Sequence, residues 1–200
     1  MNRIAEILLD WYAREGRDLP WRRTRDPYRI WLSEVILQQT RVAQGMEYYL
    51  RFTERFPDVA SLAAAPEDEV LKLWQGLGYY SRARSLQRSA RVMVDQYGGC
   101  LPDTYSDLIQ LPGIGDYTAG AILSIAFNKA VPAVDGNVLR IAARLTACGD
   151  NVLDPRTRQH IRDALAAVMP TDRPGDFNQA MMDLGAAVCL PKNPNCESCP

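Results

Sequence analysis

The stretch LPGIG at residues 111–115 decides the fold, because it places a sharp turn between two short helical patterns. Its glycines, Gly113 and Gly115, let the backbone turn tightly and approach a ligand without clashes from a Cβ atom. Thr104 can cap the helix before the turn, and Asp116 can open the helix after it. The N-terminus of that second helix offers unpaired N–H groups and the positive end of the helix dipole. The stretch therefore predicts a phosphate-binding hairpin or, more simply, a helix–helix turn whose glycines serve packing.

Helical periodicity dominates the rest of the chain. Within residues 81–97, for example, apolar side chains recur on one helical face while the arginines lie mostly elsewhere. Asp154 followed by Pro155 is typical of an N-cap with proline at the first helical position. Strand signals are nearly absent, so we predict an all-α protein of roughly ten helices joined by short turns. The expected helices cover residues 2–14, 28–38, 42–56, 67–74, 81–97, 105–110, 116–127, 136–148, 175–188 and a segment that runs from Pro155 to Val168.

Length and charge limit the class of protein. A chain of 200 residues suffices for one large domain or two small ones that share a core. No apolar run approaches the roughly 18–20 residues that span a bilayer, and the charged N-terminus lacks a signal-peptide layout, so we expect a cytoplasmic protein without a membrane partner. The net charge of −1 argues weakly against nucleic acid. Backbone N–H groups can nevertheless bind phosphate locally in an acidic protein.

Two carboxylates are candidate functional groups because of their positions in the sequence. Asp135, in VDGNV, precedes a helical pattern and has the position of an N-cap. Glu34, in WLSEVILQQT, has largely apolar neighbours, which tend to raise the pKa of a carboxyl and suit it to act as a general acid. The simpler alternative for Glu34 is a helix glutamate that faces solvent.

Together with YTAGA at residues 117–121, the LPGIG stretch resembles the helix-hairpin-helix of a DNA-repair superfamily that includes endonuclease III and the adenine glycosylases. WLSEVILQQT is similar to a segment of the adenine glycosylases. Further matches at residues 19–22, 76–84 and 177–185 extend the resemblance over nearly the whole chain. It implies a two-lobed helix-hairpin-helix glycosylase fold: a six-helix lobe over 22–130, and an iron–sulfur-type lobe over 1–21 plus 131–200 with the cluster loop at 189–200.

The resemblance also assigns roles to the carboxylates. It implies a monomeric, nucleoid-associated enzyme that flips adenine, mispaired with 8-oxoguanine or guanine, out of double-stranded DNA. Glu34 would be the general acid, and Asp135, with Asn137 close by, would stabilise or attack the sugar cation. Endonuclease III-type enzymes carry a lysine where this chain has Tyr117. Because a tyrosine cannot form a Schiff base, we expect a monofunctional glycosylase that leaves an abasic site.

The same resemblance implies a set of DNA- and base-contacting residues. The hairpin residues Gly113, Ile114 and Gly115 would hold the phosphate backbone. Gln38, Gln39 and Tyr79 would enter the opened base stack, and Thr40 would also contact DNA. The adenine pocket would be lined or bordered by Trp21, Arg22, Leu37 and Gln179.

Three cysteines crowd the C-terminal end: Cys189, Cys196 and Cys199. In a cytoplasmic chain such crowding indicates metal rather than disulfides. The resemblance implies a [4Fe–4S] cluster held by four thiolates, the fourth of which would fall at about residue 205, so its occupancy in this chain stays open. A zinc site is the alternative.

Two other functions remain open at this point. One is a thymine–guanine mismatch glycosylase of the same superfamily. The other is a non-catalytic DNA-binding module that uses the hairpin as a clamp. Glu34 and the Gln38-Gln39-Thr40 segment favour adenine over thymine.

Overall fold

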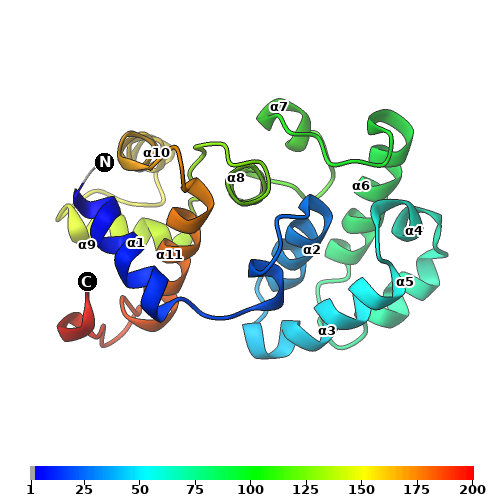
Figure 1. Ribbon diagram of the computed structural model, residues 1–200, viewed down its shortest axis with the longest axis horizontal. Coiled ribbons are helices and arrows are strands. Elements are labelled where there is room, and N and C mark those ends of the chain that lie inside the picture. The colour runs from blue at the N-terminus through cyan, green and yellow to red at the C-terminus, as the bar shows by residue number, and fades with distance from the viewer. Residues whose placement is uncertain (1–2) are drawn as a thin grey trace. The chain divides into compact units, whose positions relative to one another are not determined.

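The computed structural model describes residues 3–200, and within them it contains eleven α-helices, two short 3-10 helices and no strand (Figure 1). The all-α prediction is therefore confirmed. Among these residues no helix is both long enough and apolar enough to cross a membrane. The chain divides into two compact units, one formed by Pro20–Ile122 and the other by Met1–Leu19 together with Leu123–Pro200.

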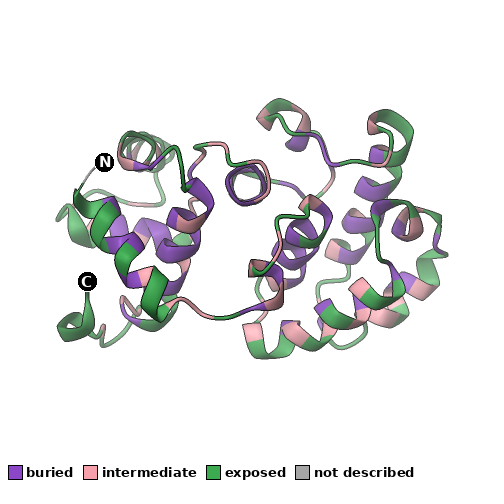
Figure 2. Cartoon of the chain, viewed as in Figure 1, coloured by how far each residue is buried: buried purple, intermediate pink, exposed green. Residues whose placement is uncertain are grey.

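The unit Pro20–Ile122 is built around large buried aromatic side chains. Phe52 lies edge-on to Trp74, with ring centroids 5.7 Å apart, and both are fully buried. Figure 2 marks further buried residues along α2 and α6. Helices α2, α3, α4, α5 and α6 pack around this centre. The elements of the unit are η1 (Pro20–Arg22), α2 (Pro27–Leu37), α3 (Val42–Arg55), α4 (Val59–Ala64), α5 (Glu67–Trp74), α6 (Ser81–Tyr97), α7 (Tyr105–Leu108) and the beginning of α8 (Asp116–Ile125).

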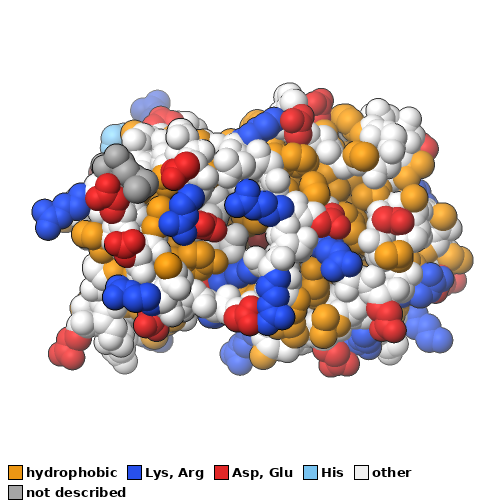
Figure 3. Space-filling view, in the orientation of Figure 1, with side chains coloured by type: hydrophobic (Ala, Val, Ile, Leu, Met, Phe, Trp, Pro, Cys, Tyr) orange, Lys and Arg blue, Asp and Glu red, His pale blue; other side chains and the backbone are white. Residues whose placement is uncertain are grey.

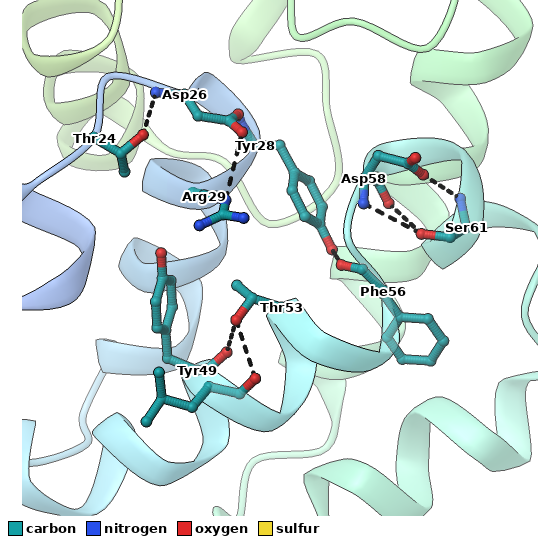
Figure 4. Close-up of polar contacts among 10 residues, drawn as sticks. Thr24, Asp26, Tyr28, Arg29, Tyr49, Thr53, Phe56, Asp58 and Ser61 are labelled. Atoms are coloured by element: carbon teal, nitrogen blue, oxygen red, sulfur yellow. Dashed lines mark hydrogen bonds and ion pairs between the residues drawn. The ribbon is translucent and has the colours of Figure 1, made fainter.

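Helix α4 was not among the expected helices. It has six residues, too few to show apolar periodicity. Its start is nevertheless marked by a capping box, in which the Asp58 side chain accepts a hydrogen bond from the Ser61 N–H at 2.7 Å and the Ser61 hydroxyl is 3.3 Å from the Asp58 N–H (Figure 4). An aspartate followed three residues later by a serine was the local signal available in the sequence.

Helix α2 is held at its N-terminal end by two contacts. The Asp26 carboxylate caps the helix by accepting from the Tyr28 N–H at 2.9 Å. The Tyr28 hydroxyl donates to the Phe56 carbonyl at 2.7 Å, at the end of α3 (Figure 4). Burial, with a smaller contribution from the negative charges of Asp58 and Asp26, raises the pKa of Tyr28 well above its ordinary value of 10.0. These contacts fix the helix that carries Glu34.

We expect Tyr28→Phe to lower the free energy of unfolding by about 1 kcal/mol near neutral pH, because it removes one buried hydrogen bond. The raised pKa also makes wild-type stability fall as the pH rises above 10.0, since the unfolded chain then releases a proton that folded Tyr28 retains. The variant lacks this contribution and should show a shallower alkaline decline. Urea unfolding across this pH range measures both effects. Tyr97→Phe, at the half-buried end of α6, is the control and should keep the wild-type decline.

The other unit combines the two ends of the chain. Helix α1 (Arg3–Glu15) packs against α11 (Pro174–Ala187), which also contacts α9 (Gly136–Leu145). α10 (Pro155–Val168) packs on α9, and η2 (Cys196–Ser198) lies near the C-terminus. Phe177 and Leu9 are buried in the shared core. Arg17 donates from Nε to Asp183 at 2.7 Å and thereby ties the segment after α1 to α11.

A buried asparagine fixes the segment that leads to Asp135. The Asn178 amide donates to the Ser124 hydroxyl at 2.8 Å and to the Val131 carbonyl at 3.0 Å. Its side-chain oxygen accepts from the Ala133 N–H at 3.1 Å. Because a buried amide is costly to leave unpaired, these three bonds hold the extended connection in one path.

Candidate functional site

The LPGIG stretch forms a turn between α7 and α8. The Thr104 hydroxyl caps α7, accepting from the Asp107 N–H at 3.2 Å, as predicted. Gly113 has φ +82°, and a Cβ atom there would lie 2.9 Å from the Ser85 Cβ, so the position requires glycine on both conformational and steric grounds. Ile114 is buried and anchors the turn, while Gly113 and Gly115 are exposed. The turn is therefore packed through the Ile114 side chain, and its backbone is exposed to solvent at Gly113 and Gly115.

Glu34 lies on α2 and is buried, with 8 % of its surface exposed. Its helix neighbours Ser33 and Val35 are buried as well. The solvent-facing alternative is therefore wrong.

Two exposed side chains project from left-handed backbone. Gln39, in the turn after α2, has φ +55°, and Tyr79, before α6, has φ +46°. The Tyr79 side chain is 64 % exposed. Non-glycine residues adopt this conformation only where surrounding contacts enforce it. Both residues are among those expected to contact DNA.

A cavity of about 160 Å³ lies between the end of α2, the start of α6 and the hairpin. Gln38, Arg82 and Gly113 are among its lining residues. The Gln38 amide donates to the Thr118 hydroxyl of α8 at 3.4 Å. Leu37 and Thr40, which flank Gln38 and Gln39, are half-buried. The structure thus brings the segment after Glu34 beside the hairpin.

The other residues predicted for the site are buried or half-buried, and they are distributed over both units. Trp21 is buried and lies edge-on to Tyr49 at 5.1 Å, while Arg22 beside it is half-buried. Tyr117, the second residue of α8, is also half-buried. In the other unit Gln179 is buried, and its side-chain oxygen accepts from the Tyr12 hydroxyl at 2.9 Å.

Asp135 is the N-cap of α9, as its position indicated. One carboxylate oxygen accepts from the Val138 N–H at 2.8 Å, and the other accepts from the Asn137 amide at 2.9 Å. The side chain is half-buried. Its negative charge at a helix N-terminus is favourable, because the helix dipole is positive there. The capping geometry also fixes where this carboxylate points.

Sequence reasoning missed a chain of hydrogen bonds behind Asp135. The Arg140 guanidinium donates to the Asn137 side-chain oxygen at 2.9 Å and to the Cys189 carbonyl at 2.9 Å. Asn137 thereby connects Asp135 to Arg140, and Arg140 connects α9 to the cysteine segment. The spacing of Asn137 and Arg140, three apart on a helix, was the available signal.

The three C-terminal cysteines line one cavity of about 170 Å³, whose wall is mostly apolar. The Arg144 guanidinium donates to the Cys189 sulfur at 3.3 Å. Burial, with the nearby Cys189 and Cys196, raises the pKa of the Cys199 thiol. Among residues 3–200, however, no three Cys, His, Asp or Glu side chains stand close enough to form a metal site. The donor type suits a [4Fe–4S] cluster, and Cys189, Cys196 and Cys199 would supply three of the four thiolates that such a cluster requires.

Comparison with known proteins defines the class. Residues 32–167 match the family described as HhH-GPD superfamily base excision DNA repair protein. The chain belongs to this superfamily.

Within that superfamily, the chain is similar to proteins named adenine DNA glycosylase. It is 48 % identical to the protein of Rattus norvegicus over 96 % of this chain, and 48 % identical to the protein of Homo sapiens over 98 % of this chain. In both cases the match spans 39 % of the relative's length. Identity to the protein of Buchnera aphidicola (subsp. Acyrthosiphon pisum) is 42 %, over 98 % of this chain and 57 % of the relative.

Solved structures agree with the fold. A thermostable thymine-DNA glycosylase gives a TM-score of 0.89 at 30 % identity, covering 98 % of this chain and 90 % of that one. An endonuclease III–DNA complex gives 0.81 at 26 % identity, covering 98 % and 89 %.

Proposed function

We propose that this protein is a base-excision glycosylase that removes adenine mispaired with 8-oxoguanine or guanine from double-stranded DNA. The observation that carries the proposal is the buried carboxyl of Glu34 on α2, in a chain 42–48 % identical to proteins named adenine DNA glycosylase. A buried acid suits this substrate because adenine leaves poorly as an anion and leaves readily once protonated.

The hairpin at residues 111–115 would bind the DNA backbone. Its exposed glycines and the adjoining N-terminus of α8 offer N–H groups to a phosphate without requiring a lysine. Basic and acidic side chains are interspersed over the face in Figure 3, in keeping with the net charge of −1. Local backbone donors therefore explain phosphate binding better than a general positive field does.

Base extrusion would use the exposed residues on left-handed backbone. In this proposal Gln38, Gln39 and Tyr79 fill the gap that the flipped adenine leaves, next to Thr40. Four further residues would line or border the adenine pocket: Trp21, Arg22, Leu37 and Gln179. Polar glutamines at the end of a largely buried helix are otherwise hard to explain.

The chemistry would divide between two carboxyl groups. Glu34 donates a proton to the adenine ring, and the bond between the sugar carbon and the base nitrogen breaks with its electron pair leaving on adenine. Positive charge then develops on the sugar. The ionised carboxylate of Asp135, oriented by Asn137, stabilises that charge or attacks the carbon. A water molecule then adds to the same carbon, displacing the Asp135 carboxylate if it has bonded there, and its proton returns to the Glu34 carboxylate.

Tyr117 stands where a lyase would need an amine, so we expect the product strand to remain intact. Denaturing electrophoresis of the reacted duplex should show cleavage only after alkali or heat, because no Schiff base forms and β-elimination does not follow. Efficient nicking under neutral conditions would contradict the monofunctional assignment.

Cys189, Cys196 and Cys199 would provide three of the ligands of a [4Fe–4S] cluster. Such a cluster would order the C-terminal loop and would have no redox step in base release. Iron and sulfide analysis of the purified protein tests this: about four of each per chain is expected. Stoichiometric zinc without sulfide would favour the zinc alternative.

Matched duplexes test the proposed substrate. One carries adenine opposite 8-oxoguanine, and the other carries thymine opposite guanine, with the same flanking sequence. We expect adenine release to be faster. Faster thymine release would instead support the activity named for the thymine-DNA glycosylase of similar fold, and no base release with intact binding would support a non-catalytic module.

A further inference from the structure

We propose that Arg82 is a positioning residue that holds two DNA-facing loops in one arrangement, and that opening of the base stack, rather than DNA association, depends on it. The loops are the turn at residues 38–40, which carries Gln39, and the loop at residues 75–80, which carries Tyr79. This inference rests on the proposed function, in which both loops contact DNA.

The first set of contacts joins Arg82 to the end of α2. Its Nη1 donates to the Val35 carbonyl at 3.1 Å and the Ile36 carbonyl at 3.0 Å, and it also contacts the Gln38 carbonyl. The last carbonyls of a helix lack partners within the helix, and a positive charge is favourable there. Both Nη atoms also lie 3.3 Å from the Thr40 hydroxyl. The guanidinium thus caps α2 and closes the 38–40 turn.

The second set of contacts joins the same guanidinium to the 75–80 loop. Its Nη2 lies 3.3 Å from the Leu77 carbonyl and 3.4 Å from the Gly78 carbonyl. The Trp74 indole N–H also donates to the Gly78 carbonyl, at 2.9 Å. The guanidinium lies 5.1 Å from the centre of the Trp74 ring and 5.7 Å from that of Tyr79. These distances permit cation–π attraction to both rings.

Both loops need an external support. Gln39 and Tyr79 have φ of +55° and +46°, a conformation that residues with a Cβ atom disfavour. Gln38, the first residue of the 38–40 turn, borders the cavity of about 160 Å³ together with Arg82. A planar guanidinium can donate to acceptors on two loops at once, whereas the three N–H groups of a lysine ammonium lie on one atom. Arginine is therefore required at this position, rather than a positive charge alone.

Arg82→Gln and Arg82→Lys test the inference in the whole protein. We expect single-turnover release of adenine opposite 8-oxoguanine to fall about 100-fold in Arg82→Gln, because a displacement of about 1 Å at the wedge misplaces the base. The Kd for an undamaged duplex, measured by fluorescence anisotropy, should change less than about threefold, since phosphate binding uses the hairpin. Lysine should restore only part of the rate. Arg55→Lys, which alters a surface ion pair with Glu69 in the same unit, should leave both quantities unchanged.

A duplex with 2-aminopurine beside the mispair reports unstacking without any chemistry. Wild-type protein should raise its fluorescence and Arg82→Gln should not. In a Tyr79→Ala background, Arg82→Gln should lower the rate further by less than about threefold. Both substitutions act on the same step, because Arg82 positions the loop that carries Tyr79. The inference would be overturned if the two substitutions lowered the rate by fully additive amounts. It would also be overturned if Arg82→Gln weakened binding to the duplex but left unstacking normal.

Two observations distinguish this inference from a folding defect and from failure of the proposed function. If circular dichroism shows that both Arg82 variants fail to fold, Thr40→Val provides the test, because it removes the hydroxyl that accepts from Arg82 and donates to the Gln38 carbonyl. Thr40→Val should still reduce unstacking while the Kd is unchanged. Unchanged unstacking would count against the inference. If wild-type protein releases no adenine, the proposed function fails, while Arg82-dependent unstacking would still support the positioning role.

Discussion

Glu34→Gln should slow adenine release by about 10²–10⁴-fold, the range that a positioned general acid contributes. The substitution keeps the size of the side chain but removes the proton that the adenine ring would take. Because Glu34 is buried on α2 and the exposed glycines of the hairpin would hold the phosphate, binding to duplex DNA should persist. Single-turnover kinetics and fluorescence anisotropy with the same duplex measure the two properties.

The control for Glu34 is its neighbour Ser33. Ser33 is also buried on α2, and its hydroxyl donates to the Ile30 carbonyl at 2.7 Å. Ser33→Ala disturbs the packing of the helix without removing an acid, so it should retain most of the activity. If Glu34→Gln keeps more than about a tenth of the wild-type rate, the carboxyl is not the acid.

Asp135→Asn should lower the rate of base release by about 10²–10³-fold while leaving the fold intact. Asparagine is as good an N-cap as aspartate, so the bond from the Val138 N–H can be kept. The negative charge that would face the sugar cation is lost. Thermal unfolding and single-turnover kinetics, measured on the same preparation, separate the structural role of the side chain from its electrostatic role.

A second capping aspartate provides the matched comparison. Asp154 caps α10 by accepting from the Arg156 N–H at 2.8 Å. Asp154→Ala and Asp135→Ala should each lose about 1 kcal/mol of stability with the cap. Only Asp135→Ala should also lose base release. Equal activity in the two alanine variants would show that Asp135 is an N-cap and nothing more.

Local rules gave much of the fold in advance. The segment 81–97 is a helix over those residues, and the caps at Thr104, Asp135 and Asp154 follow from side-chain type and position. The final segment, expected to be a loop, contains only the short turn η2. These features depend on residues within one turn of each other, which is the range that sequence patterns describe.

The supporting contacts lay outside that range. Arg82 reaches carbonyls 44 to 47 positions away, and Arg140 reaches Cys189 49 positions away. Neither partner is marked by spacing, because any exposed carbonyl can accept from an arginine. Burial of Glu34 likewise depends on which face of α2 the other helices cover. Sequence reasoning could therefore select the candidate chemical groups, whereas the residues that hold them required the three-dimensional structure.

The joining of both chain ends in one unit has a consequence for synthesis. The unit Pro20–Ile122 is continuous, so it can complete its core as soon as its last residue leaves the ribosome. Helix α1 precedes that unit in the chain, yet its buried residues Leu8, Leu9 and Trp11 pack in a core with α11 residues that follow it. We therefore expect α1 to expose an apolar face on the ribosome until α11 has been synthesised.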